Sequence, residues 1–176
     1  VQTDAFGGVY FGGDSLPSPL VFTDNLCLDG GVSGRLSVTV TGPRGEPLFA
    51  QDAGLELPPR ASQWLAVRVP ERTEGLCRLE ATVRVGETAE TVSRSFATFA
   101  APHPAGLMPE SWLGACTHFG QGKGDVPRSF DLMSRAGIKW LRDEISWGAC
   151  EREKGKIVIP EWADRYMRAA VEHGVT

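Results

Sequence analysis

The feature that most constrains the fold is a change of hydrophobic period near residue 100. Before it, apolar and polar residues alternate, as Leu36, Val38 and Val40 do with their neighbours, and residues 76–85 repeat the pattern. Such alternation is typical of strands with one solvated and one buried face. After residue 110, short apolar runs are separated by apolar residues at helical spacing. We therefore expect two domains of different class, covering residues 1–100 and 110–176.

The N-terminal domain is expected to be an antiparallel β-sandwich. Turn-forming sequences rich in Gly and Pro separate its alternating runs. Short strands at this spacing, without intervening helices, are typical of a sandwich. The first 18 residues supply either another edge strand or a loose arm. The predicted strands are residues 20–26, 34–41, 47–52, 62–69, 76–85 and 88–99.

The C-terminal domain is expected to begin a parallel α/β fold. Residues 101–109 form a linker, in which Pro102 and Pro104 favour an extended backbone. Residues 112–119 are nearly continuously apolar, which is typical of a parallel strand buried on both faces. A helix follows between residues 125 and 137, then a strand over residues 138–145 and a second helix from Pro160 to Gly174. The last two residues are expected to begin a third strand, which gives the order βαβα.

Charge and hydropathy exclude two classes of partner. The formal net charge is -4, and no basic stripe is present, which argues against a nucleic-acid partner. No apolar run approaches the roughly 20 residues that span a bilayer, so we expect no membrane span. The sequence begins without Met. We expect either a removed leader or a piece of a larger protein, and secretion or cell-surface display is one open alternative for its location.

The four cysteines do not indicate a metal site. Their spacing matches no zinc motif, so we predict no metal. Cys27 and Cys77 both fall in the β-rich half, and the alternatives are a disulfide between them or buried free thiols. The glycine-containing loop at residues 120–124 has neither Walker nor dinucleotide spacing, so we predict no phosphate site there.

Chemically active side chains follow the two predicted parallel strands. His118 comes at the end of the first strand, and Arg142, Asp143 and Glu144 come at the end of the second, with Trp147 just beyond. In a (β/α)8 barrel, the carboxyl ends of the strands build the active site. These five residues are therefore the predicted binding residues.

Three segments resemble the opening of a clan A glycoside hydrolase, a retaining TIM-barrel glycosidase. They read "LGACTHFG", "AGIKWLRDEISWGACEREKG" and "WADRYMRAAVEHGV", and the second is similar to sequences of glycoside hydrolase families 39, 5 and 42. The upstream half is similar to the accessory β-sandwich domains that precede such barrels. The resemblance implies a β-sandwich followed by an incomplete (β/α)8 barrel, of which only the first two strands and two helices are present.

The resemblance also implies roles for the strand-end residues. Arg142 matches an arginine that holds the catalytic nucleophile ionised, and His118 matches a position that contacts sugar. Asp143 and Glu144 would accept hydrogen bonds from sugar hydroxyls, or would pair with Arg142 in a surface ion pair. Trp147 would stack on a sugar ring, or would pack between its loop and the barrel rim.

The catalytic carboxylates of such an enzyme are not expected in this sequence. Retaining glycosidases use two carboxylates about 5 Å apart, without a cofactor. The resemblance places them on the fourth and seventh barrel strands, beyond Thr176. Asp143 and Glu144 are adjacent on a strand and so point to opposite faces. We expect an N-terminal part of a hydrolase of O-glycosidic bonds in oligosaccharides or polysaccharides, inactive alone, which self-associates or pairs with the remaining barrel.

Two other functions stay open. The chain could be a carbohydrate-binding or cell-surface β-sandwich module that does not hydrolyse sugar, or a partner-binding domain without sugar chemistry. Exposed aromatic residues on a sandwich face would favour the carbohydrate-binding module. Trp64 is the residue to examine, and the sequence leaves it either in the core or on the surface.

Overall fold

The chain forms two compact units, Val1–Ala101 and Pro102–Thr176. The computed structural model describes residues 1–26, 29–69, 73–102 and 109–176. Each unit has its own hydrophobic core. Most of the predicted linker, residues 101–109, lies outside the described residues.

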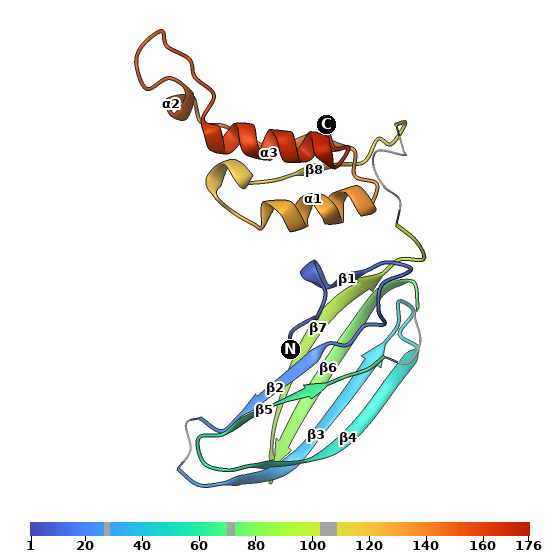
Figure 1. Cartoon of the computed structure of the whole chain (residues 1–176). Helices are drawn as coiled ribbons and strands as arrows, with labels where there is room; N and C mark the ends of the chain where they lie inside the picture. Colours follow the sequence, from blue (N-terminus) through green and yellow to red (C-terminus); the bar gives the residue numbers. More distant parts are fainter. Residues whose placement is uncertain (27–28, 70–72, 103–108) are drawn as a thin grey trace. The chain divides into compact units, whose positions relative to one another are not determined.

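Two sheets build the N-terminal unit (Figure 1). The larger has the strand order β1-β7-β6-β3-β4 and the smaller consists of β2 and β5. All neighbouring strands are antiparallel except β1, which pairs in parallel with the end of β7. The N-terminal segment thus supplies an edge strand. The strands are β1 (Val9–Tyr10), β2 (Leu20–Asp24), β3 (Val32–Thr41), β4 (Pro47–Leu57), β5 (Ser62–Ala66), β6 (Gly75–Val85) and β7 (Thr88–Thr98).

The core of this unit lies between the two sheets. The alternation in β3 buries Leu36, Val38 and Val40, and β6 buries Leu79 on the same side. Val21 of β2 and the segment after β5 approach from the small sheet and complete the cluster. A β-sandwich-like arrangement is therefore present, as the alternation predicted. The cluster comprises Tyr10, Val21, Leu36, Val38, Val40, Val67, Val69, Cys77, Leu79, Ala81 and Phe96.

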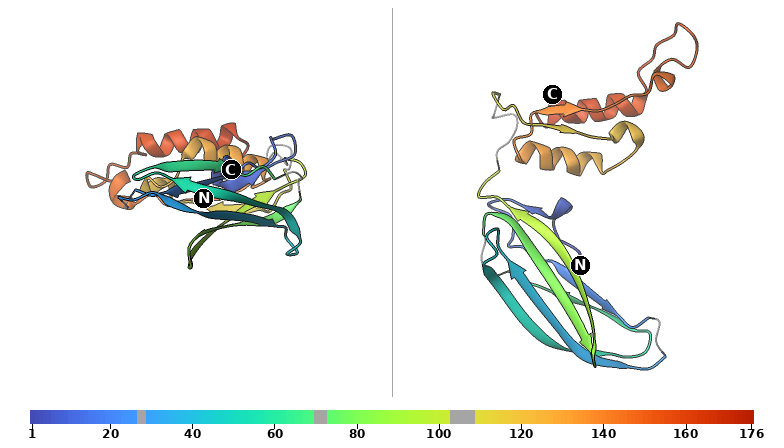
Figure 2. Two further views of the ribbon diagram at one scale, coloured as in Figure 1. Left: turned by 90° about the horizontal axis from the view of Figure 1, so that it is seen from below. Right: turned by 180° about the vertical axis from the view of Figure 1, so that it is seen from behind.

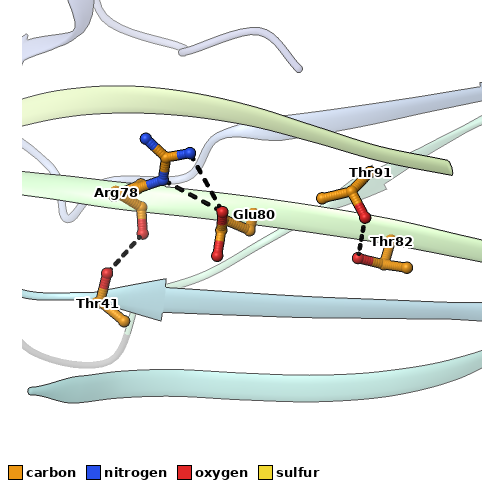
Figure 3. A network of polar contacts seen from close by, with 5 residues as sticks. All are labelled: Thr41, Arg78, Glu80, Thr82 and Thr91. Atoms are coloured by element: carbon orange, nitrogen blue, oxygen red, sulfur yellow. Dashed lines mark hydrogen bonds and ion pairs between the residues drawn. The ribbon is translucent and has the colours of Figure 1, made fainter. Parts of the chain in front are cut away.

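The outer face of the large sheet is polar. Figure 3 shows Arg78 paired with Glu80 at 3.2 Å on β6, and the Thr82 hydroxyl hydrogen-bonded to Thr91 of β7 at 2.8 Å. On β3, the Thr41 hydroxyl donates to the carbonyl of Arg78 at 3.4 Å. The two threonine hydrogen bonds link neighbouring strands, the Arg78–Glu80 pair lies within β6, and each contact contributes less than about 1 kcal/mol.

Strand β2 ends at Asp24, two residues before its predicted end. The side-chain amide of the next residue, Asn25, donates to the carbonyls of Gly30, Leu57 and Pro58 at 2.9–3.2 Å. The Asn25 backbone still bonds to Ala61 and Arg60, and its side chain holds the chain at the turn that follows. By contrast, β4 continues to Leu57, five residues beyond its predicted end.

The cysteine alternatives are tested in part. Cys77 is a buried free thiol, which fits the interpretation of a small core residue. Burial, with a smaller contribution from Glu46, raises the pKa of the Cys77 thiol. Cys27 lies outside the described residues.

The C-terminal unit contains a short parallel sheet with helices on one side (Figure 2, right). Asp125 caps α1 by accepting a hydrogen bond from Arg128 N at 3.1 Å, and Gly137 follows the helix with φ +71°. The elements are β8 (Gly114–Cys116), the 3-10 helix η3 (Phe119–Gln121), α1 (Val126–Arg135), β9 (Trp140–Arg142), α2 (Trp147–Cys150) and α3 (Glu161–Glu172).

The predicted third strand begins where expected. Thr176 N donates to Lys139 O at 2.8 Å, and Leu141 N donates to Thr176 O at 2.9 Å. These bonds place residue 176 along the edge of β9 that faces away from β8. The chain order strand, helix, strand, helix is confirmed, with the additional short helix α2 before α3.

The prediction that residues 112–119 are buried on both faces is wrong. Ala115 and Leu141 pack against the helices, where Phe130 and Tyr166 fill the core. On the opposite face Trp112 is 85% and Trp140 50% exposed. No described element of this unit lies over that face. The apolar residues 112–119 are therefore buried on the helix side of the sheet and exposed on the other.

No helix in the described part of the chain has the length and apolar character needed to cross a membrane.

Candidate functional site

The ends of β8 and β9 place His118, Arg142, Asp143 and Glu144 at one end of the short sheet, and Trp147 follows at the start of α2. Cys116 lies opposite Arg142 in the parallel register, and Thr117 N donates to Arg142 O at 2.9 Å. The next residues along the two strands, His118 and Asp143, therefore leave the same edge of the sheet. The sequence prediction of one strand-end cluster agrees with this geometry.

Arg142 pairs with Glu144 and not with Asp143. Its Nη2 lies 2.8 Å from Glu144 Oε1, and both side chains are largely exposed. Hydrogen bonds to the Cys116 thiol and to Glu144 raise the pKa of Arg142, so the guanidinium stays charged. The pair lies on the solvated face of the sheet and presents one cation and one anion at the strand end.

Asp143 has a different role from its neighbour Glu144. Its Oδ2 accepts hydrogen bonds from Thr117 Oγ1 at 2.8 Å, from Phe119 N at 2.7 Å and from Gly120 N at 3.3 Å. Its Oδ1 accepts from Glu144 N at 2.6 Å. Burial raises the pKa of Asp143, but the hydrogen bonds outweigh it and hold that pKa below the usual range. Both oxygens of this carboxylate are engaged within the chain.

His118 and Trp147 are both accessible. His118 is exposed, and its carbonyl accepts hydrogen bonds from Gln121 N and Lys123 N. Trp147 is 68% exposed. Its Nε1–H donates to Glu151, whose other oxygen accepts from Gly155 N at 2.6 Å. The indole is thus fixed at one edge, and most of its surface stays open.

Sequence reasoning missed two residues that organise this site. Thr117 supplies a hydroxyl to Asp143, and Glu151 joins Trp147 to the turn at Gly155. The spacing of four residues between Trp147 and Glu151 is a helical contact distance, and it was the available signal.

The strand-end residues do not line the hollow beside them. A hollow of about 560 Å³ lies between η3 and α3. Its walls include Phe119, Gly120, Trp162, Arg165 and Tyr166, and none of the five predicted binding residues. Trp162 and Tyr166 pack together with ring centroids 6.1 Å apart. The strand-end cluster is an open surface rather than an enclosed pocket.

Metal chemistry finds no support in the described residues. Among them, no group of three or more His, Cys, Asp or Glu side chains gathers as a metal site. Around the strand ends the chain offers a cation, one accessible carboxylate, an imidazole and an indole face, which suit hydrogen bonding and stacking.

Comparison with solved structures identifies a similar fold. The chain is similar to a family 39 glycoside hydrolase from the gut symbiont Bacteroides cellulosilyticus WH2, with a TM-score of 0.58 and 21% identity. The match covers 96% of this chain and 31% of that one, so this chain spans about a third of its length. This likeness extends over both units and concerns the fold.

Weaker likenesses carry no argument of their own. A Bacteroides uniformis beta-glucuronidase matches with a TM-score of 0.44 and 16% identity, over 89% of this chain and 24% of that one. The CARDB domain of the PF1109 protein from Pyrococcus furiosus matches with a TM-score of 0.43 and 21% identity, over 53% and 86%. No protein-family model and no curated protein matches the chain.

Proposed function

We propose that this chain is the N-terminal part of a glycoside hydrolase that cleaves O-glycosidic bonds of an oligosaccharide or polysaccharide. The strand-end cluster then forms one wall of the sugar-binding cleft. The observation that carries the proposal is the placement of the Arg142–Glu144 pair and the exposed His118 after the paired ends of β8 and β9, with the exposed Trp147 three residues beyond Glu144 in the chain. Ligand sites of parallel α/β folds lie at this end of the strands.

Each accessible side chain has a chemical task in such a wall. The Glu144 carboxylate and the Arg142 guanidinium accept and donate hydrogen bonds to vicinal sugar hydroxyls, which are both donors and acceptors. The exposed indole of Trp147 covers the apolar C–H face of a pyranose. Arg142 also supplies a fixed positive charge that would keep a neighbouring nucleophilic carboxylate ionised.

The half-solvated sheet supports a larger barrel around this wall. Trp112 and Trp140 are exposed on the face opposite the helices, where a (β/α)8 barrel packs its interior. Thr176 starts a further parallel strand beside β9. We propose that more strands complete the barrel and supply the two catalytic carboxylates, so that this chain alone binds sugar without hydrolysing it.

Titration with oligosaccharides tests the proposal. The isotopically labelled chain is titrated with xylohexaose and with cellohexaose while the indole N–H signal of Trp147 is followed by NMR. We expect a saturable shift with at least one sugar, and about tenfold weaker binding for Trp147→Ala. Trp64→Ala in the other unit is the matched control and should leave this shift unchanged. The absence of any saturable shift up to 10 mM would argue against a sugar wall at the strand ends.

A second candidate function has its own support in the sandwich. Phe22 of β2 and Trp64 of β5 are cross-strand neighbours with ring centroids 4.7 Å apart, and they are 38% and 54% exposed. Asp24 and Ser62, the next outward pair along the two strands, offer hydrogen-bonding groups beside the rings. An exposed aromatic pair flanked by polar side chains favours a carbohydrate-binding module.

The two candidates separate in a binding assay on insoluble polysaccharides. If the sandwich binds sugar, Trp64→Ala removes retention of the chain on cellulose or xylan while Trp147→Ala keeps it. If only the strand ends bind, the opposite pattern appears. Phe22→Leu keeps apolar area but loses the ring, and should weaken retention less than Trp64→Ala does.

A further inference from the structure

We propose that Asp143 is a positioning residue of the strand-end site. Its carboxylate clamps the loop after β8 onto the end of β9 and fixes where His118 stands relative to Arg142. The role of the clamp in sugar binding rests on the proposed function, whereas the clamp itself rests on the contacts of this unit.

The clamp joins two segments that are 23 to 26 residues apart. Three donors converge on Asp143 Oδ2: the Thr117 hydroxyl at 2.8 Å and the backbone N–H groups of Phe119 and Gly120 at 2.7 and 3.3 Å. A fourth donor, Glu144 N, binds Oδ1 at 2.6 Å. Hydrogen bonds to an ionised acceptor are roughly twice as strong as neutral ones, so this group holds the loop more tightly than ordinary turn bonds do.

The backbone contact under the clamp leaves no room for a side chain. A Cβ built on Gly120 would lie 2.2 Å from Glu144 O. Any residue other than glycine at position 120 would therefore force the backbone to move. The loop and the strand end therefore touch through backbone atoms at the point where the carboxylate ties them together. A sugar hydroxyl could reach Asp143 only by displacing one of its four donors, so this residue positions the site rather than contacting sugar.

The residues on both sides of His118 in the chain are hydrogen-bonded to Asp143. Thr117 and Phe119, its neighbours in the chain, both donate to Asp143 Oδ2. Thr117 N also donates to Arg142 O, which fixes the backbone of His118 next to that of Arg142. The His118 imidazole has no hydrogen bond to another described residue and is exposed. The backbone under this ring is thus fixed while the ring is left free to bind.

Hydrogen exchange and the His118 ring signals test the clamp in the full chain. Asp143→Ala should speed amide exchange at Phe119 and Gly120 by tenfold or more and should shift the ring signals of His118. Thr117→Val removes one donor and should produce the same changes at about a third of the size, while Thr117→Ser restores the wild-type values. Asp131→Ala is the matched control, because Asp131 is an exposed carboxylate on α1 that pairs with Arg135 at 3.8 Å.

The possible results are easily separated. Unchanged exchange at Phe119 and Gly120, or unchanged His118 signals despite faster exchange, would overturn the positioning role. If Asp143→Ala fails to fold, the pair Thr117→Val and Thr117→Ser decides the question alone. Binding of xylohexaose or cellohexaose is measured separately: wild-type chain that binds neither sugar refutes the proposed function, while the exchange data still decide the clamp.

Discussion

The two units of this chain differ in how completely they bury their sheets. In the sandwich, both inner faces meet, and Val40, Val67 and Leu79 are fully buried. In the α/β unit, the helices cover one face of β8 and β9, and the other face exposes Trp112 and Trp140. An antiparallel pair of sheets can close a core within 100 residues, whereas a parallel sheet needs cover on both faces.

The contrast explains where the candidate chemistry lies. The sandwich uses its outward polar residues to link strands, as Arg35 does with Asp52 at 2.9 Å. The α/β unit instead leaves charged and aromatic side chains accessible at the strand ends, and uses one carboxylate, Asp143, to fix the backbone there. The open unit is therefore the better place for a binding site.

Core truncations should show the largest effect and separate the units. Leu79→Ala is expected to lower the free energy of unfolding of the sandwich by about 2–5 kcal/mol, and Phe130→Ala that of the α/β unit by about 3–5 kcal/mol. Both side chains are fully buried in their own cores. Urea unfolding followed by circular dichroism should show each substitution moving only one of two transitions. A single transition that shifts with both would contradict independent units.

Thiol labelling should show that a cysteine of the sandwich is better protected from solvent than one of the α/β unit. Cys77 is buried in the sandwich with a raised pKa, and Cys116 is exposed on the open sheet. The rate of thiol modification depends on the fraction of thiolate and on solvent exposure. We therefore expect Ellman's reagent at pH 8 to modify Cys116 at least about tenfold faster than Cys77 in native protein. Cys116→Ser removes the fast phase and serves as the control. Equal rates would show that the sandwich opens as readily as the α/β unit.

The pH dependence of stability should sharpen the role of Asp143. Its folded pKa is lower than its unfolded value of about 3.9, so its contribution is fully present above that value and is lost as the pH falls through the folded pKa. The difference in unfolding free energy between wild type and Asp143→Ala should be constant from pH 7 to 5 and shrink below about pH 4. Urea unfolding at pH 7, 5 and 3 measures it. A difference that persists at pH 3 would point to lost packing.

The smallest effect should come from the exposed pair of the sandwich. Hydrogen bonds from Ser37 and Arg35 lower the pKa of Asp52, but the group is fully exposed. Asp52→Asn should therefore change the urea midpoint only slightly, and 1 M NaCl should remove much of that change because salt screens exposed charges. Asp143→Ala should lose little of its effect in the same salt. An equal salt dependence of the two substitutions would mean that the Asp143 contacts are as solvated as those of Asp52.

The sequence predicted the fold where hydrophobic period decides the structure. Alternation located six of the strands, and the capping pattern at Asp125 and Gly137 located α1. It overestimated β8 and β9, because three-residue strands end where pairing partners end rather than where apolar residues stop. It also missed the short helix α2, which lies between two polar stretches and has no buried residue.

Within the candidate site, residue types were predictable and contacts were not. Order along the chain indicated that His118, Arg142, Asp143 and Glu144 would lie together, because parallel strands end at one edge of a sheet. The sequence analysis left open which carboxylate pairs with Arg142. The structure selects Glu144, which shares a strand face with Arg142, over the adjacent Asp143.

By itself, the sequence determined the change from a two-residue to a helical period, the order of elements and the clustering of charged residues after two apolar strands. These follow from local rules, because burial periodicity, helix caps and turns depend on near neighbours in the chain. Only the tertiary structure decided that Asp143 holds the loop after β8, that Glu144 forms an ion pair with Arg142, and that Trp64 and Trp147 are exposed. The Asp143 contacts and the exposed faces depend on hydrogen bonds and packing between residues far apart in sequence, which no local pattern encodes.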